Sequence, residues 1–126
     1  MTIQDAIQKV NAIEPNQYST DDKIDWLSRL DWQIWREIII THEGYDPNKK
    51  FEGYTDSTDP QQELLIGAPD DEGIYINYLK AKIFEANHEM GKYNQAIVFF
   101  NDAYLNFWNY YNSTHMPVTK VPYFNF

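Results

Sequence analysis

Two histidine–glutamate pairs are the residues of this sequence that come nearest to a metal site. They are His42-Glu43 and His88-Glu89. Zinc peptidases place two histidines four residues apart on one helix with a glutamate beside the first, and neither pair has its second histidine. Folding would have to bring further ligands to either pair. The sequence therefore predicts no metal site.

Acidic residues gather in the middle of the chain, where they raise the question of a calcium site. They are Asp56, Asp59, Asp70, Asp71 and Glu72. A calcium loop of the EF-hand kind needs twelve residues with a central glycine and a terminal glutamate, and that pattern does not fit this region. We interpret these residues as parts of turns and as a helix cap.

Side chains for covalent or phosphate chemistry are absent or lie at unfamiliar spacings. The chain has no cysteine, no glycine-rich phosphate loop, no nucleophile elbow and no serine with a histidine at a familiar spacing. We expect no catalytic residue, no metal ligand and no cofactor. The sequence therefore predicts a binding protein rather than an enzyme.

Length and composition predict one folded domain, residues 1–126, since 43% of the residues are hydrophobic and 17% are aromatic. The formal net charge of −9, without any run of Lys and Arg, argues against sequence-specific nucleic-acid binding. No apolar run is long enough for a membrane span, and the N-terminal stretch does not resemble a signal peptide. Together with the lack of cysteine, these features favour the cytoplasm.

Apolar periodicity predicts an all-α fold, a small bundle of about four helices. The predicted helices cover 2–13, 20–41, 72–90 and 92–113. The last two form a helical hairpin, 73–112, with Gly91 between them. Glycine is suited to the left-handed conformation that ends many helices.

The segments outside these helices are predicted to be a long loop and a tail. Glycine and proline punctuate residues 43–71, but aromatic residues and the run Leu64-Leu65-Ile66 predict an ordered loop that packs on the core. Two prolines predict an extended tail over 117–126. The tail either folds back on its own core or is held for a partner.

Asp31 lies among the apolar residues of the predicted helix 20–41. An unpaired carboxylate there would cost several kcal/mol, so we expect Asp31 either to accept hydrogen bonds from arginine, tyrosine or backbone donors or to lie at the edge of the apolar stripe. A structural role for this buried polar residue is favoured, and a functional role is the alternative.

Several large apolar residues fall outside the predicted core faces. Trp26 and Ile40 lie on the far side of the helix 20–41, and Trp32 projects from a third side. Candidate interaction residues are therefore Trp26, Trp32, Ile40, Val98, Leu105, Tyr123, Phe124 and Phe126. Val98 and Leu105 are either solitary exposed aliphatic residues or part of a subunit contact.

The stretch from Gly91 to Ala103 resembles the second helix of a tetratricopeptide repeat, with Tyr93, Ala96 and Phe100 at matching spacings. No second copy occurs, and solenoids need about three repeats. We interpret the resemblance as convergent packing of a helical hairpin. It supports one hypothesis, that the chain is a cytoplasmic peptide-binding or regulatory module.

A second resemblance spans most of the chain. It rests on these segments: Tyr18-Ser-Thr-Asp-Asp-Lys-Ile24-Asp-Trp-Leu-Ser-Arg-Leu-Asp31, Ile38-Ile-Ile-Thr-His-Glu43, Glu63-Leu-Leu-Ile-Gly-Ala-Pro69, Ile76-Asn-Tyr-Leu79, Gly91-Lys-Tyr-Asn94 and Tyr110-Tyr-Asn-Ser-Thr-His-Met-Pro117. The chain is similar to small helical proteins of tailed phages and prophages of low-GC Gram-positive bacteria, which resemble head-tail connector (adaptor or head-completion) proteins.

This resemblance implies a structural role. Copies would form or join a ring beneath the portal, complete the DNA-filled head and present a surface for tail docking. The implied partners are other copies of the chain in the assembled particle, the portal and the tail or neck proteins, without a membrane. In isolation the chain is expected to be either an oligomer or a monomer. The implied location is the virion, and the bacterial host cytoplasm before assembly.

Overall fold

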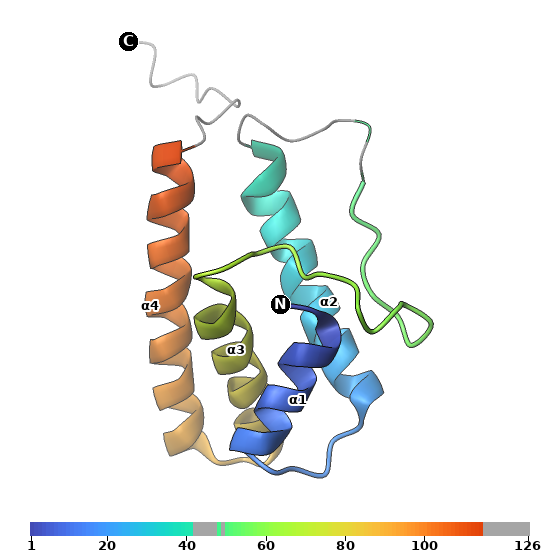
Figure 1. Ribbon diagram of the computed structural model, residues 1–126. Coiled ribbons are helices and arrows are strands. Elements are labelled where there is room, and N and C mark those ends of the chain that lie inside the picture. The colour runs from blue at the N-terminus through green and yellow to red at the C-terminus, as the bar shows by residue number, and fades with distance from the viewer. Residues whose placement is uncertain (42–47, 49, 115–126) are drawn as a thin grey trace.

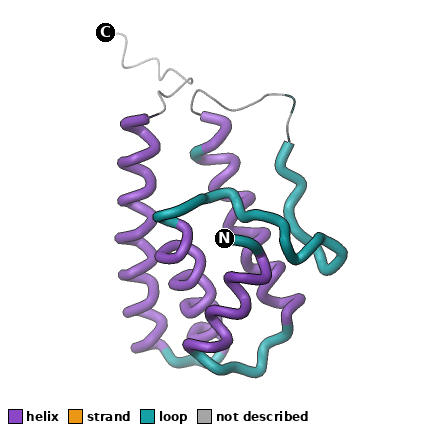
Figure 2. Tube along the Cα trace, viewed as in Figure 1, coloured by secondary structure: helices purple, strands orange, loops and turns teal. Residues whose placement is uncertain are grey.

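The computed structural model describes residues 1–41, 48 and 50–114, and within these it is a helical bundle. The helices are α1 (Ile3–Ile13), α2 (Thr20–Glu37), α3 (Asp71–Ala86) and α4 (Met90–Thr114), with a short 3₁₀ helix, η1, at Ile39–Thr41. No named strand occurs in the described part of the chain (Figures 1 and 2). The prediction of an all-α bundle of about four helices is confirmed.

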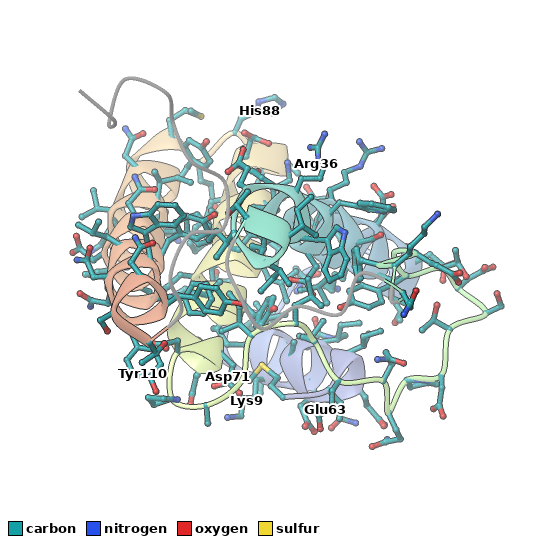
Figure 3. All side chains as sticks on the ribbon, turned by 90° about the horizontal axis from the view of Figure 1, so that it is seen from above. Lys9, Arg36, Glu63, Asp71, His88 and Tyr110 are labelled. Atoms are coloured by element: carbon teal, nitrogen blue, oxygen red, sulfur yellow. The ribbon has the colours of Figure 1, made fainter. Side chains whose placement is uncertain are left out.

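Helix α3 lies at the centre of the bundle. It packs against α1, α2 and α4, whereas α4 packs against α3 alone among the described helices. Figures 1 and 3 show α4 at one side and α1 and α2 at the other, with α3 between them. Gly73 permits the close approach of α3 and α4, since a Cβ atom there would lie 3.2 Å from the Cβ of Ala103.

Side-chain caps explain where α1 and α2 begin. The Thr2 hydroxyl accepts a hydrogen bond from the amide of Asp5, whose carboxylate accepts one from the amide of Thr2, which is a complete capping box. The Ser19 hydroxyl accepts from the amide of Asp22. Each cap precedes an apolar stripe that enters the core, so local signals and burial agree.

Helix α2 ends at Glu37, and the last part of the predicted helix 20–41 is the 3₁₀ turn. The run Ile38-Ile39-Ile40-Thr41 is β-branched throughout, and such residues lose side-chain freedom in an α-helix. The Thr41 hydroxyl also donates to the carbonyls of Glu37 (3.0 Å) and Ile38 (2.9 Å), at the end of the helix.

The turn between α3 and α4 is centred on His88, whereas the sequence predicted it at Gly91. The predicted helix 72–90 ends at Ala86, and α4 begins at Met90, so that Gly91 lies in its first turn. His88 takes the left-handed conformation (φ 62°). Amides of His88 and Glu89 donate to the carbonyls of Glu85 and Phe84, the two hydrogen bonds of a Schellman motif.

The long connection before α3 is partly extended and packs on the N-terminal end of α1. Amides of Ile3 and Gln4 donate to the carbonyls of Gln62 and Pro60, and the amide of Leu64 donates to the carbonyl of Met1. Tyr54, Leu64 and Ile66 are buried in the core. Residues 42–47 of this region and the predicted tail 117–126 lie outside the described residues.

Candidate functional site

Asp31 is the centre of a buried hydrogen-bond cluster that joins three segments of the chain. Its side chain is fully buried. One carboxylate oxygen accepts from the Tyr75 hydroxyl (2.7 Å), and the other accepts from the Tyr54 hydroxyl (2.5 Å) and the amide of Leu65 (3.2 Å). The Tyr75 hydroxyl in turn accepts from the amide of Ile66 (2.9 Å). Helix α2, the long connection and α3 are thus joined through one carboxylate.

A second contact holds the long connection against α2 beside this cluster. The amide of Tyr54 donates to the Ser28 hydroxyl (2.9 Å), which lies one helical turn from Asp31. Gly53 precedes Tyr54 and has a positive φ of 79°. A Cβ atom at Gly53 would lie 2.7 Å from the indole nitrogen of Trp32 and 2.8 Å from the Ser28 hydroxyl oxygen. Glycine is therefore required here by both conformation and space.

The electrostatics of the cluster favour a structural role. Burial raises the pKa of Asp31, and the hydrogen bonds from Tyr54, Tyr75 and Leu65 oppose this without cancelling it. Burial and the nearby carboxylate raise the pKa of both tyrosine hydroxyl groups, so they remain protonated donors. Because Asp31 has no contact with solvent, it has no access to a substrate.

No family model, curated protein or solved structure matches this chain.

The described residues contain no group of three or more His, Cys, Asp or Glu side chains that could hold a metal ion. Within the same residues, no helix is both long enough and apolar enough to cross a membrane.

The candidate interaction residues of the N-terminal half are partly covered by neighbouring aromatic rings. Trp26 is half-buried, with its ring 5.8 Å from that of Tyr18 in an edge arrangement. Trp32 is 38% exposed, and its ring lies 5.1 Å from that of Phe51. Ile40 is half-buried in η1, so it does not extend an α-helical face.

The candidate residues of α4 face outward. Val98 is 56% exposed and Leu105 is 55% exposed. Phe99 and Tyr110 are also exposed, at 49% and 60%, although helical periodicity groups them with the buried Phe107. Figure 3 shows Tyr110 at the outside of the bundle. These residues lie on the one helix that has a single helical neighbour, which leaves an apolar surface without cover from the described residues.

The remaining candidates, Tyr123, Phe124 and Phe126, lie outside the described residues. Sequence analysis also missed Lys23, which is buried and donates from its Nζ atom to the carbonyl oxygen of Tyr18 (2.6 Å). Burial lowers the pKa of Lys23, and the nearby Asp22 carboxylate opposes this change. No local sequence pattern marks a lysine as buried, so the burial of Lys23 could not be predicted from the sequence.

A shallow apolar groove lies between α1 and the start of α2. Its volume is about 310 Å³. Ile3, Ile7 and Ile24 form its apolar part, and Gln4, Gln8 and Asn11 add uncharged polar groups. These isoleucines belong to the buried core, and the groove lies over them.

Proposed function

We propose that this chain is a structural protein of a phage head-tail connector or neck. In this proposal, copies form or join a ring beneath the portal, complete the DNA-filled head and present a surface for tail docking. The observation that carries the proposal is the pair of exposed aliphatic residues on α4, Val98 and Leu105. A free-standing protein gains nothing from large apolar residues in water, whereas a subunit buries them in its neighbours.

The Asp31 cluster fits this role. A ring subunit must present its contact surfaces in fixed positions, and the cluster fastens the long connection to α2 and α3 through buried hydrogen bonds. The net charge of −9 also suits a channel through which DNA slides, because acidic walls repel phosphate groups.

A test of the connector compares the full chain with a chain truncated after Met116. Light scattering over a range of concentrations gives the solution mass, and electron microscopy shows the form of any assembly. Closed rings that weaken on truncation are expected. Strict monomers in both forms at every concentration would contradict a ring that the chain builds by itself.

A second candidate function is a cytoplasmic peptide-binding or regulatory module. It is favoured by the groove between α1 and α2, whose volume of about 310 Å³ can hold a few apolar side chains of a peptide. This function predicts a stable monomer that binds apolar peptides. Fluorescence titration of the monomer with a library of apolar peptides tests it, and saturable binding lost on Gln8→Glu, a change at an exposed side chain of the groove, would support it.

A further inference from the structure

Helix α4 differs from α2 in its low number of charged side chains. Among the 25 residues of α4, the charged side chains are Lys92 and Asp102. Helix α2 is shorter, at 18 residues, yet it has eight charged side chains. Val98 and Leu105, which we call the α4 ridge, stand one heptad apart among exposed amide side chains such as Asn101 and Asn109.

The groove between α1 and α2 has the same chemical character. Its apolar part is formed by isoleucines and Pro60, and its polar lining consists of uncharged side chains, among them Gln4, Gln8 and Asn11. None of the described residues that line it is charged. In a protein with a net charge of −9, a groove and a ridge that are both apolar and amide-rich are chemically matched.

The two surfaces lie on opposite sides of the molecule. Figures 1 and 3 show α4 on one side of α3, with α1 and α2 on the other. The α4 ridge therefore cannot reach the groove of its own chain. It can meet only the groove of another molecule.

We propose that the α4 ridge of one copy docks in the groove between α1 and α2 of the next copy. Val98 and Leu105 pack over Ile3, Ile7 and Ile24, and the amides around the ridge pair with Gln4, Gln8 and Asn11 at the rim. Apart from Asp102, no charged side chain of the described residues lies beside the ridge or lines the groove, so this contact keeps most acidic side chains of the two copies apart and limits their mutual repulsion.

A contact of ridge against ridge is disfavoured by Asp102. Suppose that the α4 helices of two copies paired antiparallel, with Val98 of each helix against Leu105 of the other. The midpoints of the two ridges, near Asp102, would then lie opposite one another. The two Asp102 carboxylates would then face one another, at a cost to the free energy of association. Unlike surfaces on opposite sides instead give a head-to-tail contact, which produces a ring if the rotation closes and a filament if it does not.

The docking specifies which surfaces would join the copies of the proposed connector. Only the closure of the copies into a ring depends on the connector proposal. The experiment uses sedimentation velocity on the full chain over a range of concentrations. A ridge variant carries Val98→Asn and Leu105→Asn, and a groove variant carries Gln8→Glu. Controls are Ile13→Asn with Met90→Asn, two exposed apolar residues outside both surfaces, and Gln33→Glu, which changes the net charge equally.

Wild-type chain is expected to associate with rising concentration, and each variant to weaken association by about tenfold or more while the controls do not. An equimolar mixture of the ridge variant and the groove variant retains one intact contact, so it should form heterodimers and nothing larger. A wild-type monomer, a groove variant that associates like the wild type, or a mixture without heterodimers would overturn the docking.

Failure of the docking and failure of the connector give different results. Closed rings that persist in the ridge and groove variants would overturn the docking and leave the connector. Open filaments that both variants abolish would support the docking and contradict the connector. Circular dichroism of each variant checks that the fold is retained, because the substituted side chains are exposed and should change the free energy of unfolding by less than about 0.5 kcal/mol.

Discussion

The two tyrosines bound to Asp31 should differ in what their hydroxyl groups contribute to stability. The Tyr75 hydroxyl donates to Asp31 (2.7 Å) and accepts from the amide of Ile66 (2.9 Å). The Tyr54 hydroxyl also donates to Asp31, but the same carboxylate oxygen keeps a second donor, the amide of Leu65 (3.2 Å). Replacing either tyrosine by phenylalanine keeps the buried ring and removes only these bonds.

The expected cost follows from that count of bonds. Tyr54→Phe loses one hydrogen bond to a charged group, which is worth about 1.5–3 kcal/mol. Tyr75→Phe loses a similar bond and leaves the amide of Ile66 without a partner, which adds about 1–3 kcal/mol. Tyr75→Phe should therefore lower the free energy of unfolding by at least about 1 kcal/mol more than Tyr54→Phe. Against a total of about 5–15 kcal/mol, this difference is measurable.

Urea unfolding at pH 7, followed by circular dichroism, gives these free energies. Tyr110→Phe is the control, because Tyr110 is 60% exposed and its substitution should change stability by less than about 0.5 kcal/mol. The slope of free energy against urea should stay the same for all variants. An equal loss for Tyr54→Phe and Tyr75→Phe, or a larger loss for Tyr54→Phe, would refute the reasoning.

Three other predictions follow from the described contacts. Because burial raises the pKa of Asp31 above its ordinary value of 3.8, the folded state holds this proton more tightly than the unfolded state. The free energy of unfolding of the wild type, relative to that of Asp31→Asn, should therefore fall as the pH rises from below 3.8 through the raised pKa. Urea unfolding of both proteins from pH 3 to 7 measures this difference. A difference that grows in favour of the wild type as the pH rises would contradict the prediction. Gly53→Ala should destabilise the protein by about 2 kcal/mol, because alanine is strained at positive φ and its Cβ would collide with Ser28 and Trp32. Urea unfolding measures this loss, with Gly67→Ala as the control because the space around Gly67 is open. Equal losses for the two variants would count against this account. His88→Gly should stabilise the protein by about 1 kcal/mol, because glycine adopts the left-handed conformation without strain; a lower thermal midpoint would argue against it.

The helices were predictable where a cap and an apolar stripe coincide. Thr2 and Ser19 mark the starts of α1 and α2, because their side chains satisfy amides a few residues away. The turn between α3 and α4 was misplaced because glycine at Gly91 is the stronger local signal. The buried stripe of α3 ends near Phe84, while Met90 is exposed, so the helix stops before that glycine.

The Asp31 cluster was only half predictable. Periodicity placed Asp31 on the core face of α2, which required hydrogen-bond donors of some kind. The donors come from Tyr54 and Tyr75, which lie 23 and 44 residues further along the chain. Periodicity tells which face of a helix is buried but not which distant segment covers it, so these partners depend on the tertiary structure. The exposure of Phe99 and Tyr110 has the same origin, since nothing local shows that α4 has one helical neighbour.

That single neighbour has a consequence for the order in which the protein opens. Helix α4 can separate from α3 without disturbing the contacts among α1, α2 and α3 or the hydrogen bonds of Asp31. The backbone amides of α4 should therefore exchange with deuterium through local opening, while those of α2 and α3 near Asp31 exchange only on global unfolding. A copy that covered the outer face of α4 would slow this exchange.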